Sequence, residues 1–101
     1  MKNKFGAIRT NGYASKGEAK RAEELKLLEK AGQISDLKEQ VRFVLIPKQD
    51  GLSACSYIAD FQYMEDGVQI TEDYKGCITP VFEIKRKLMM LVHGIKIRVT
   101  R

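Results

Sequence analysis

The pattern of apolar and polar positions along the chain predicts two helices and four strands. Ser15 and Glu18 have the spacing of a capping box, and good helix formers follow as far as Ala31. Gly32 then supplies a stop, so a first helix is expected over residues 16–31. Residues 33–39 are expected to form a short connection. Runs of β-forming residues between turn signals then predict three strands, over residues 40–46, 53–65 and 68–75.

A second helix is expected after Thr79 and Pro80, which are residue types favoured at the N-cap and at the first helical position. Apolar residues then recur at helical spacing as far as Gly94, namely Val81, Ile84, Leu88, Leu91 and Val92. Apolar and polar residues alternate over residues 95–100, which predicts a last strand.

This order of elements indicates a fold of the α/β (α+β) class. We expect a mixed sheet in which three strands form an antiparallel meander, a fourth joins by a crossover connection, and two helices flank the sheet. A chain of 101 residues is long enough for one modest core and not for two, so residues 1–101 are expected to form a single domain.

The most informative stretch is the predicted hairpin around Asp66 and Gly67, a pair strongly preferred in two-residue turns. The register that such a turn imposes places Asp60 directly opposite Asp73. Lys75 lies on the same face of the sheet, two residues after Asp73. Like charges in this arrangement are destabilising, so the pair calls for an explanation.

A divalent cation removes the repulsion between two carboxylates about 5 Å apart. Oxygen ligands without cysteine or histidine favour Mg²⁺ or Mn²⁺, and a lysine beside such an ion can orient a water molecule. The competing interpretation is a solvated polar face on which Lys75 neutralises Asp73.

Glu18 is a third candidate ligand, because it falls within the apolar arc of the first helix rather than on its solvent side. An acid in that position, near the helix start, could extend toward the sheet. Glu18 also occupies the acidic position of the capping box, which explains its presence without any metal.

The charge distribution suggests a polyanionic partner. The formal net charge is +5, and residues 80–101 contain six lysines and arginines against the single acid Glu83. The segment 1–13 forms a basic N-terminal arm with Lys2, Lys4 and Arg9. No run is long enough to span a membrane, and no apolar signal-peptide core follows the N-terminus, so a cytoplasmic protein is expected.

Taken together, these residues resemble the PD-(D/E)XK nuclease superfamily, which has an Asp, then an Asp-x-Lys motif, and a helical Glu upstream. More narrowly, the chain is similar to a small phage and prophage family within that superfamily, which resembles Holliday junction resolvases. The similar stretches cover most of the chain from about residue 12 to residue 100: SKGEAKRAEELKLLEKAGQI, QVRFVLIPK, YIADFQY, EDYKG and VFEIKRKLMMLVHGI.

The resemblance implies a restriction-endonuclease-like αβββαβ core with Asp60, Asp73 and Glu18 as metal ligands and Lys75 as the catalytic lysine. Gln40 matches a polar position that lines the site. Ala59 departs from the pattern, since it stands where the motif has proline.

The activity implied is Mg²⁺- or Mn²⁺-dependent hydrolysis of phosphodiester bonds in phage DNA within a bacterial host. A chain this small offers little surface for reading base sequence, so branched or junction DNA is the expected substrate, cleaved by a homodimer. The basic residues of the second helix are expected to hold flanking phosphates: Lys85, Arg86 and Lys87. Two alternatives remain, a non-catalytic nucleic-acid-binding module with the nuclease fold and an accessory phage protein.

Overall fold

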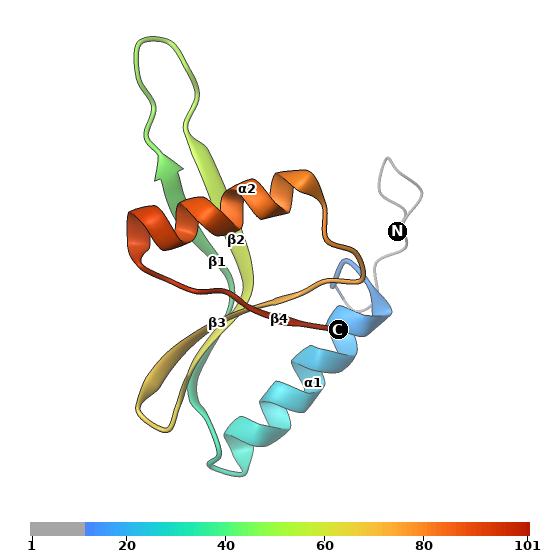
Figure 1. The fold of residues 1–101 in the computed structure, drawn as a ribbon. Helices are drawn as coiled ribbons and strands as arrows, with labels where there is room; N and C mark the ends of the chain where they lie inside the picture. Colours follow the sequence, from blue (N-terminus) through green and yellow to red (C-terminus); the bar gives the residue numbers. More distant parts are fainter. Residues whose placement is uncertain (1–11) are drawn as a thin grey trace.

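A computed structural model describes residues 12–101 as an α+β fold with a mixed four-stranded sheet (Figure 1). The elements are α1 (Lys16–Lys30), β1 (Ser35–Ile46), β2 (Cys55–Glu65), β3 (Val68–Tyr74), α2 (Pro80–Leu88), the π-helical turn η1 (Met89–His93) and β4 (Arg98–Thr100). The strand order is β1-β2-β3-β4, antiparallel through β3, with β4 parallel to β3. The predicted meander with a crossover strand is therefore confirmed.

Both helices begin where their capping residues predicted. Ser15 Oγ accepts a hydrogen bond from the Glu18 amide at 3.1 Å, and Thr79 Oγ1 accepts one from the Phe82 amide at 3.1 Å. Each side chain satisfies an amide that has no partner within its helix. Pro80 lies just inside the start of α2, where its missing N–H costs nothing.

The β2–β3 hairpin has the predicted register. Glu65 pairs with Val68 around the turn, and the ladder continues in step as far as Phe61 opposite Glu72. Asp66 and Gly67 have φ values of 51° and 76°, the left-handed conformation that this kind of turn requires at both central positions.

The prediction that residues 33–39 form a connection is wrong, because β1 already begins at Ser35. Two features hid the strand in the sequence. Its register shifts between Ser35 and Lys38, and both Asp36 and Gln40 have positive φ values, 53° and 55°. Such irregularities interrupt the two-residue alternation on which a strand prediction rests. Gln40 consequently lies in the middle of the strand and not at its start.

The C-terminal elements also differ from the prediction in detail. The second helix changes to a π-helical turn after Leu88 and ends at Gly94, whose φ is 67°. The last strand covers only Arg98–Thr100, although Ile97 just before it is buried. The alternation over residues 95–100 thus reflects packing of the segment as well as strand pairing.

The core consists of two clusters that share one face of β2. Ala22 and Leu25 of α1 pack with Ile34, Phe61 and Tyr63. The second cluster joins the C-terminal helix to the other half of the sheet and contains Leu45, Tyr57, Ala59, Phe82, Met89 and Ile97. Tyr57, Ala59, Phe61 and Tyr63, which alternate with Asp60 and its neighbours along β2, are therefore all buried.

The apolar residues at helical spacing in α2 are not the ones that it buries. Val81 and Ile84 of α2 and Leu91 of the following η1 are exposed to 62%, 59% and 81%, whereas Phe82 of α2 and Met89 of η1 are buried. Helical spacing identifies an apolar stripe but does not show what it packs against. Here most of the stripe lies on the surface.

The predicted basic arm, residues 1–13, lies outside the described residues except for Gly12 and Tyr13. The Tyr13 hydroxyl accepts a hydrogen bond from Lys26 Nζ at 3.1 Å. Among residues 12–101, no helix combines the length and apolarity needed to cross a bilayer.

A buried ion pair fastens α1 to β3. Glu72 is completely buried, and Arg21 donates to its two carboxylate oxygens at 2.7 and 2.9 Å. The Tyr63 and Thr100 hydroxyls also donate to this carboxylate. Burial on its own would raise the pKa of Glu72, but the hydrogen bonds from Arg21 and Tyr63 outweigh it and hold the pKa below its usual value.

Replacing Arg21 with Met should lower the free energy of unfolding at pH 7 by about 3 kcal/mol, because a buried charge loses its partner. The deficit should shrink toward pH 4, where Glu72 can take up a proton. Thermal unfolding of Arg21→Met, Arg21→Met/Glu72→Met and the exposed control Lys20→Met measures this. The double variant should recover most of the loss, and equal unfolding temperatures for Arg21→Met and Lys20→Met would contradict the account.

Candidate active site

Asp60 and Asp73 lie across from each other where the β2–β3 ladder ends, as the predicted register requires. The Asp73 carboxylate accepts a hydrogen bond from the Asp60 amide at 3.1 Å, and the Asp60 carboxylate accepts one from the Tyr74 amide at 2.9 Å. Each carboxylate therefore bonds to the backbone of the opposite strand, in the place of a carbonyl. These reciprocal hydrogen bonds hold the two acids together at the end of the ladder.

The pair is not on a solvated face. Asp73 is only 1% exposed, its neighbours Gln62 and Thr71 are buried, and Asp60 is partly buried. The Gln62 amide donates to the Thr71 hydroxyl at 3.4 Å, which satisfies part of this polar layer. The competing interpretation is therefore wrong in one part, because the face is buried around the pair, and right in the other, because Lys75 does form an ion pair with Asp73. The two acids repel each other more strongly than they would in water.

This environment changes the protonation of the pair. Burial, and after it the charge of Asp73, raises the pKa of Asp60 to about 7, while the hydrogen bond from the Tyr74 amide opposes the rise. The charge of Glu18 raises the Asp60 pKa further by a smaller amount. The pair consequently retains a proton up to about neutral pH, unless a cation takes the place of that proton.

Lys75 contacts the pair directly. Its Nζ lies 2.9 Å from Asp73 Oδ2, and its side chain is 30% exposed. It also lies 4.6 Å from the centre of the Phe82 ring. Asp73 Oδ2 is buried, and its contact with this ammonium is an ion pair rather than a hydrogen bond.

Glu18 is buried, as its place on the apolar arc predicted, and its amide is capped by Ser15. Gly17 brings this first turn of α1 against β3, since a Cβ at Gly17 would stand 2.1 Å from the Tyr74 hydroxyl oxygen. Among residues 12–101, however, no three Asp, Glu, His or Cys side chains gather closely enough to hold an ion. The close carboxylate pair is Asp60 and Asp73, with Glu18 beyond it.

The two acids have the chemistry that Mg²⁺ or Mn²⁺ requires. Magnesium is commonly held by one or two carboxylates, with water and substrate phosphate oxygens completing its octahedron. Asp73 Oδ2 forms an ion pair with Lys75 but no hydrogen bond, and the pKa of the facing Asp60 carboxyl is raised by burial and then by the charge of Asp73. A cation between the two carboxylates would give Asp73 Oδ2 a further partner and would reduce the repulsion between the acids.

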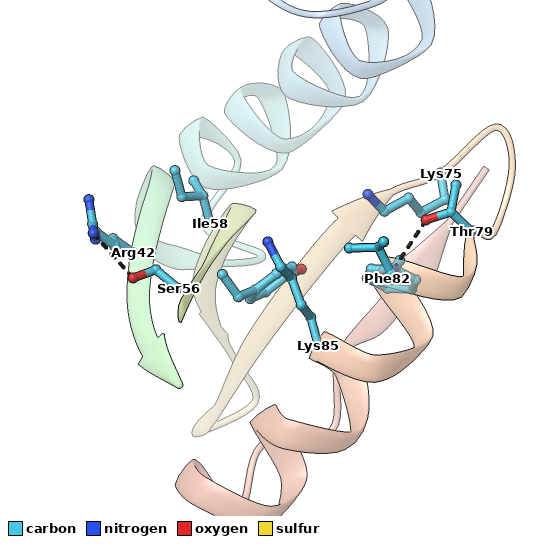
Figure 2. A pocket seen from close by; sticks show the side chains of 9 residues that line it. Arg42, Ser56, Ile58, Lys75, Thr79, Phe82 and Lys85 are labelled. Carbon is cyan, nitrogen blue, oxygen red and sulfur yellow. Dashed lines mark hydrogen bonds between the residues drawn. The ribbon is translucent and has the colours of Figure 1, made fainter. Parts of the chain in front are cut away.

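The residues predicted to bind nucleic acid lie in three different places. Gln40 is exposed in β1 opposite Asp60, since the pairs on either side of it are Glu39 with Phe61 and Val41 with Ala59. Lys85 lines a pocket together with Lys75 (Figure 2).

The other two basic residues of α2 do not line this pocket. Arg86 forms an ion pair with Glu83 at 2.8 Å. Lys87 lines a different groove, beside Met90 and Lys96. Of the three basic residues predicted on the second helix, only Lys85 is brought next to Lys75.

Sequence reasoning missed two residues near the pair. Tyr57 is buried in the core, and burial raises the pKa of its hydroxyl. The charges of Asp73 and Asp60 raise this pKa further, because the hydroxyl lies close to both acids. Arg42 lines the pocket that Lys75 and Lys85 share. Tyr57 does lie three residues before Asp60, but nothing in its residue type separates a core tyrosine from one beside a site.

Asp60→Asn should stabilise the metal-free protein more at pH 8.5 than at pH 5. An acid whose pKa is higher in the folded protein than in the unfolded chain lowers the free energy of unfolding as pH rises from about 4 toward 7. This destabilisation reaches its full size above that range. Asparagine keeps the acceptor for the Tyr74 amide but removes the charge.

The expected gain at pH 8.5 is about 1–2 kcal/mol, below the full linkage value because solvent screens a half-buried carboxylate. Thermal unfolding in EDTA measures it, with Asp66→Asn in the hairpin turn as the control. The same effect of Asp60→Asn at both pH values would contradict the assigned repulsion.

Comparison with known proteins identifies the family to which the chain belongs. No curated protein and no solved structure matches it. One family model matches residues 2–100, and its description is "Protein of unknown function (DUF1064)". Because this match covers nearly the whole chain, the protein belongs to the DUF1064 family.

Proposed function

We propose that the protein is a metal-dependent endonuclease that hydrolyses phosphodiester bonds in DNA. The observation that carries the proposal is the cross-strand pair of Asp60 and Asp73 with Lys75 Nζ at 2.9 Å. A binding module has no need of two repelling carboxylates, and the raised pKa of Asp60 is typical of functional sites.

The fold supports the same proposal. The order αβββαβ with a mixed sheet is the order expected of a restriction-endonuclease-like core. The candidate residues also lie on the elements that the resemblance implies, with the acids on two adjacent strands and Glu18 at the start of the first helix. Fold-level analogy alone does not assign an activity, so the weight rests on the site.

In the proposed mechanism, Asp60 and Asp73 would hold the ion, and the nearby acid Glu18 would add negative charge to the site. Bound Mg²⁺ or Mn²⁺ would polarise the scissile phosphate and lower the pKa of the attacking water. Lys75 orients that water or stabilises the charge that grows on the phosphate oxygens. Its ion pair with Asp73 fixes the ammonium at the pair before substrate arrives, so little reorganisation is needed.

The DNA strand is proposed to follow the basic side of α2. Lys85 is the best placed cation, because it shares a pocket with Lys75, while Arg86 and Lys87 add general attraction and Gln40 lies at the other side of the acids. Few side chains are placed to read bases, which favours structure-selective cleavage of branched or junction DNA. The proposed setting is phage recombination, replication or packaging in the cytoplasm of a bacterial host.

Cleavage of supercoiled plasmid and of a four-way junction with Mg²⁺, Mn²⁺ or EDTA tests the activity. Asp73→Asn and Lys75→Met should each lower the rate by roughly 100-fold or more, because they remove a ligand or a transition-state charge. Asp66→Asn makes the same charge change in the same hairpin and should retain the wild-type rate.

Cleavage that survives Asp73→Asn would remove Asp73 from the site. Binding without cleavage of any substrate by the wild type would favour the alternative of a non-catalytic DNA-binding module.

We also propose that the protein is a homodimer, which would present two sites to two strands. Two exposed apolar residues support this, Ile84 in α2 and Leu91 about two turns later in η1, which lie on one side of the C-terminal helix without cover from residues 12–101. A partner of the same chain would bury these side chains across a two-fold axis.

Light scattering after size-exclusion chromatography tests this interface. Ile84→Glu should convert a dimer to a monomer, because it places a charge in the apolar contact. Leu27→Glu, which changes an exposed leucine on α1, is the matched control and should leave the dimer intact. A monomeric wild type at micromolar concentration would contradict the homodimer.

A further inference from the structure

A pocket beside the acid pair has the composition of an anion-binding site. It is a cavity of about 380 Å³ lined by parts of β1, β2 and the start of α2, together with Lys75 (Figure 2). Three of its nine lining residues are cationic, Arg42, Lys75 and Lys85, and none of the nine carries a carboxylate. The field inside such a pocket favours a negatively charged ligand.

Two of these cations have no anionic partner. Arg42 donates a hydrogen bond to Ser56 Oγ at 3.2 Å, which orients its guanidinium without neutralising it. Neither Arg42 nor Lys85 forms an ion pair within the part of the chain that the structure describes. Figure 2 shows Lys75 and Lys85 extending into the same space between β2 and the first turn of α2. Their like charges would be relieved by an anion between them.

The floor and wall of the pocket provide further donors. Tyr57 is only 4% exposed, and its buried hydroxyl has no hydrogen-bond partner. Val81 also lines the pocket, and its amide is one of the first-turn N–H groups that α2 cannot satisfy internally. A tyrosine whose buried hydroxyl has no hydrogen-bond partner and the N-terminus of a helix therefore both border this cavity, and such donors are favourable for a phosphate.

We propose that this pocket binds one phosphate group of a DNA strand. This group is the neighbour of the scissile phosphate, which would lie at the cation site formed by Asp60 and Asp73. Lys85 and Arg42 contact its oxygens from opposite walls, and the Tyr57 hydroxyl donates from the floor. Lys75, paired with Asp73, stands between the two positions. The inference rests on the proposed function, because it describes how the same site would bind its substrate strand.

The test is DNA affinity in EDTA, where no cleavage occurs, measured by fluorescence anisotropy with a labelled oligonucleotide at several salt concentrations. Lys85→Gln and Arg42→Gln should each weaken binding about 5- to 10-fold at 0.1 M salt and lower the salt slope by about 1, as expected for one lost phosphate contact. Lys87→Gln removes the same charge from the same helix outside the pocket and should have a clearly smaller effect. Tyr57→Phe, which keeps the ring, should weaken binding by about 2- to 5-fold.

Oligonucleotides with phosphorylated and with hydroxyl ends distinguish the source of the phosphate. Equal affinities, each reduced by Lys85→Gln, identify an internal phosphodiester. A gain from a terminal phosphate that disappears in Lys85→Gln identifies a strand end, and either result supports the pocket. Losses of the same size for Lys85→Gln, Arg42→Gln and Lys87→Gln would overturn it, because they show diffuse attraction by surface charge.

The result of the DNA-affinity test does not depend on whether the protein cleaves DNA. Selective weakening by Lys85→Gln in a protein that never cleaves DNA would support the pocket and contradict the nuclease. Cleavage by the wild type together with equal losses for the three variants would leave the nuclease standing and remove the pocket. Titration with inorganic phosphate, followed by NMR, adds a probe without DNA. The Val81 amide resonance should shift in the wild type and stay in place in Lys85→Gln/Arg42→Gln.

Discussion

The repulsion between Asp60 and Asp73 is the constraint on which the rest of the site depends. The β2–β3 register brings the two carboxylates together at the end of the ladder, and each accepts a hydrogen bond from the opposite strand. These bonds keep the acids from turning apart, while burial raises the proton affinity of Asp60. The arrangement is costly for a folded protein unless a proton or a cation occupies it, which makes it informative about function.

The surrounding elements hold this hairpin end in place from several directions. On one side, α1 is fastened to β3 through Arg21 and Glu72, and β4 is fastened to the same strand through the Lys75 amide, which donates to the Thr100 carbonyl at 2.9 Å. On the other side, Phe82 anchors α2 in the core and lies under the Lys75 ammonium. The basic pocket therefore lies beside Lys75, between β2 and the start of α2 (Figure 2), and Lys75 in turn pairs with Asp73.

Local signals made much of this arrangement predictable from the sequence. The Asp66-Gly67 turn determines the register, and with it the meeting of Asp60, Asp73 and Lys75. The capping residues Ser15 and Thr79 determine where the helices begin. Such features depend on a few neighbouring residues, so they can be derived without knowledge of the whole fold.

Features that depend on contacts between distant segments were not predictable. The start of β1 was hidden by its register shift and by the positive φ values of Asp36 and Gln40. The Arg21–Glu72 pair joins residues 51 positions apart, and nothing in either segment indicates the other. The stripe of α2 was identified by its spacing, but only the packing of Phe82 and Met89 shows which side of the helix faces the core.

The most direct measurement of the central claim is an anomalous difference map from a crystal soaked in Mn²⁺. The account predicts a peak within coordination distance, about 2.2 Å, of oxygens from both Asp60 and Asp73. Such a peak should be absent from crystals of the Asp73→Asn variant treated in the same way. No peak between the two carboxylates in well-ordered wild-type crystals, with Lys75 still paired to Asp73, would contradict the assignment of a cation site.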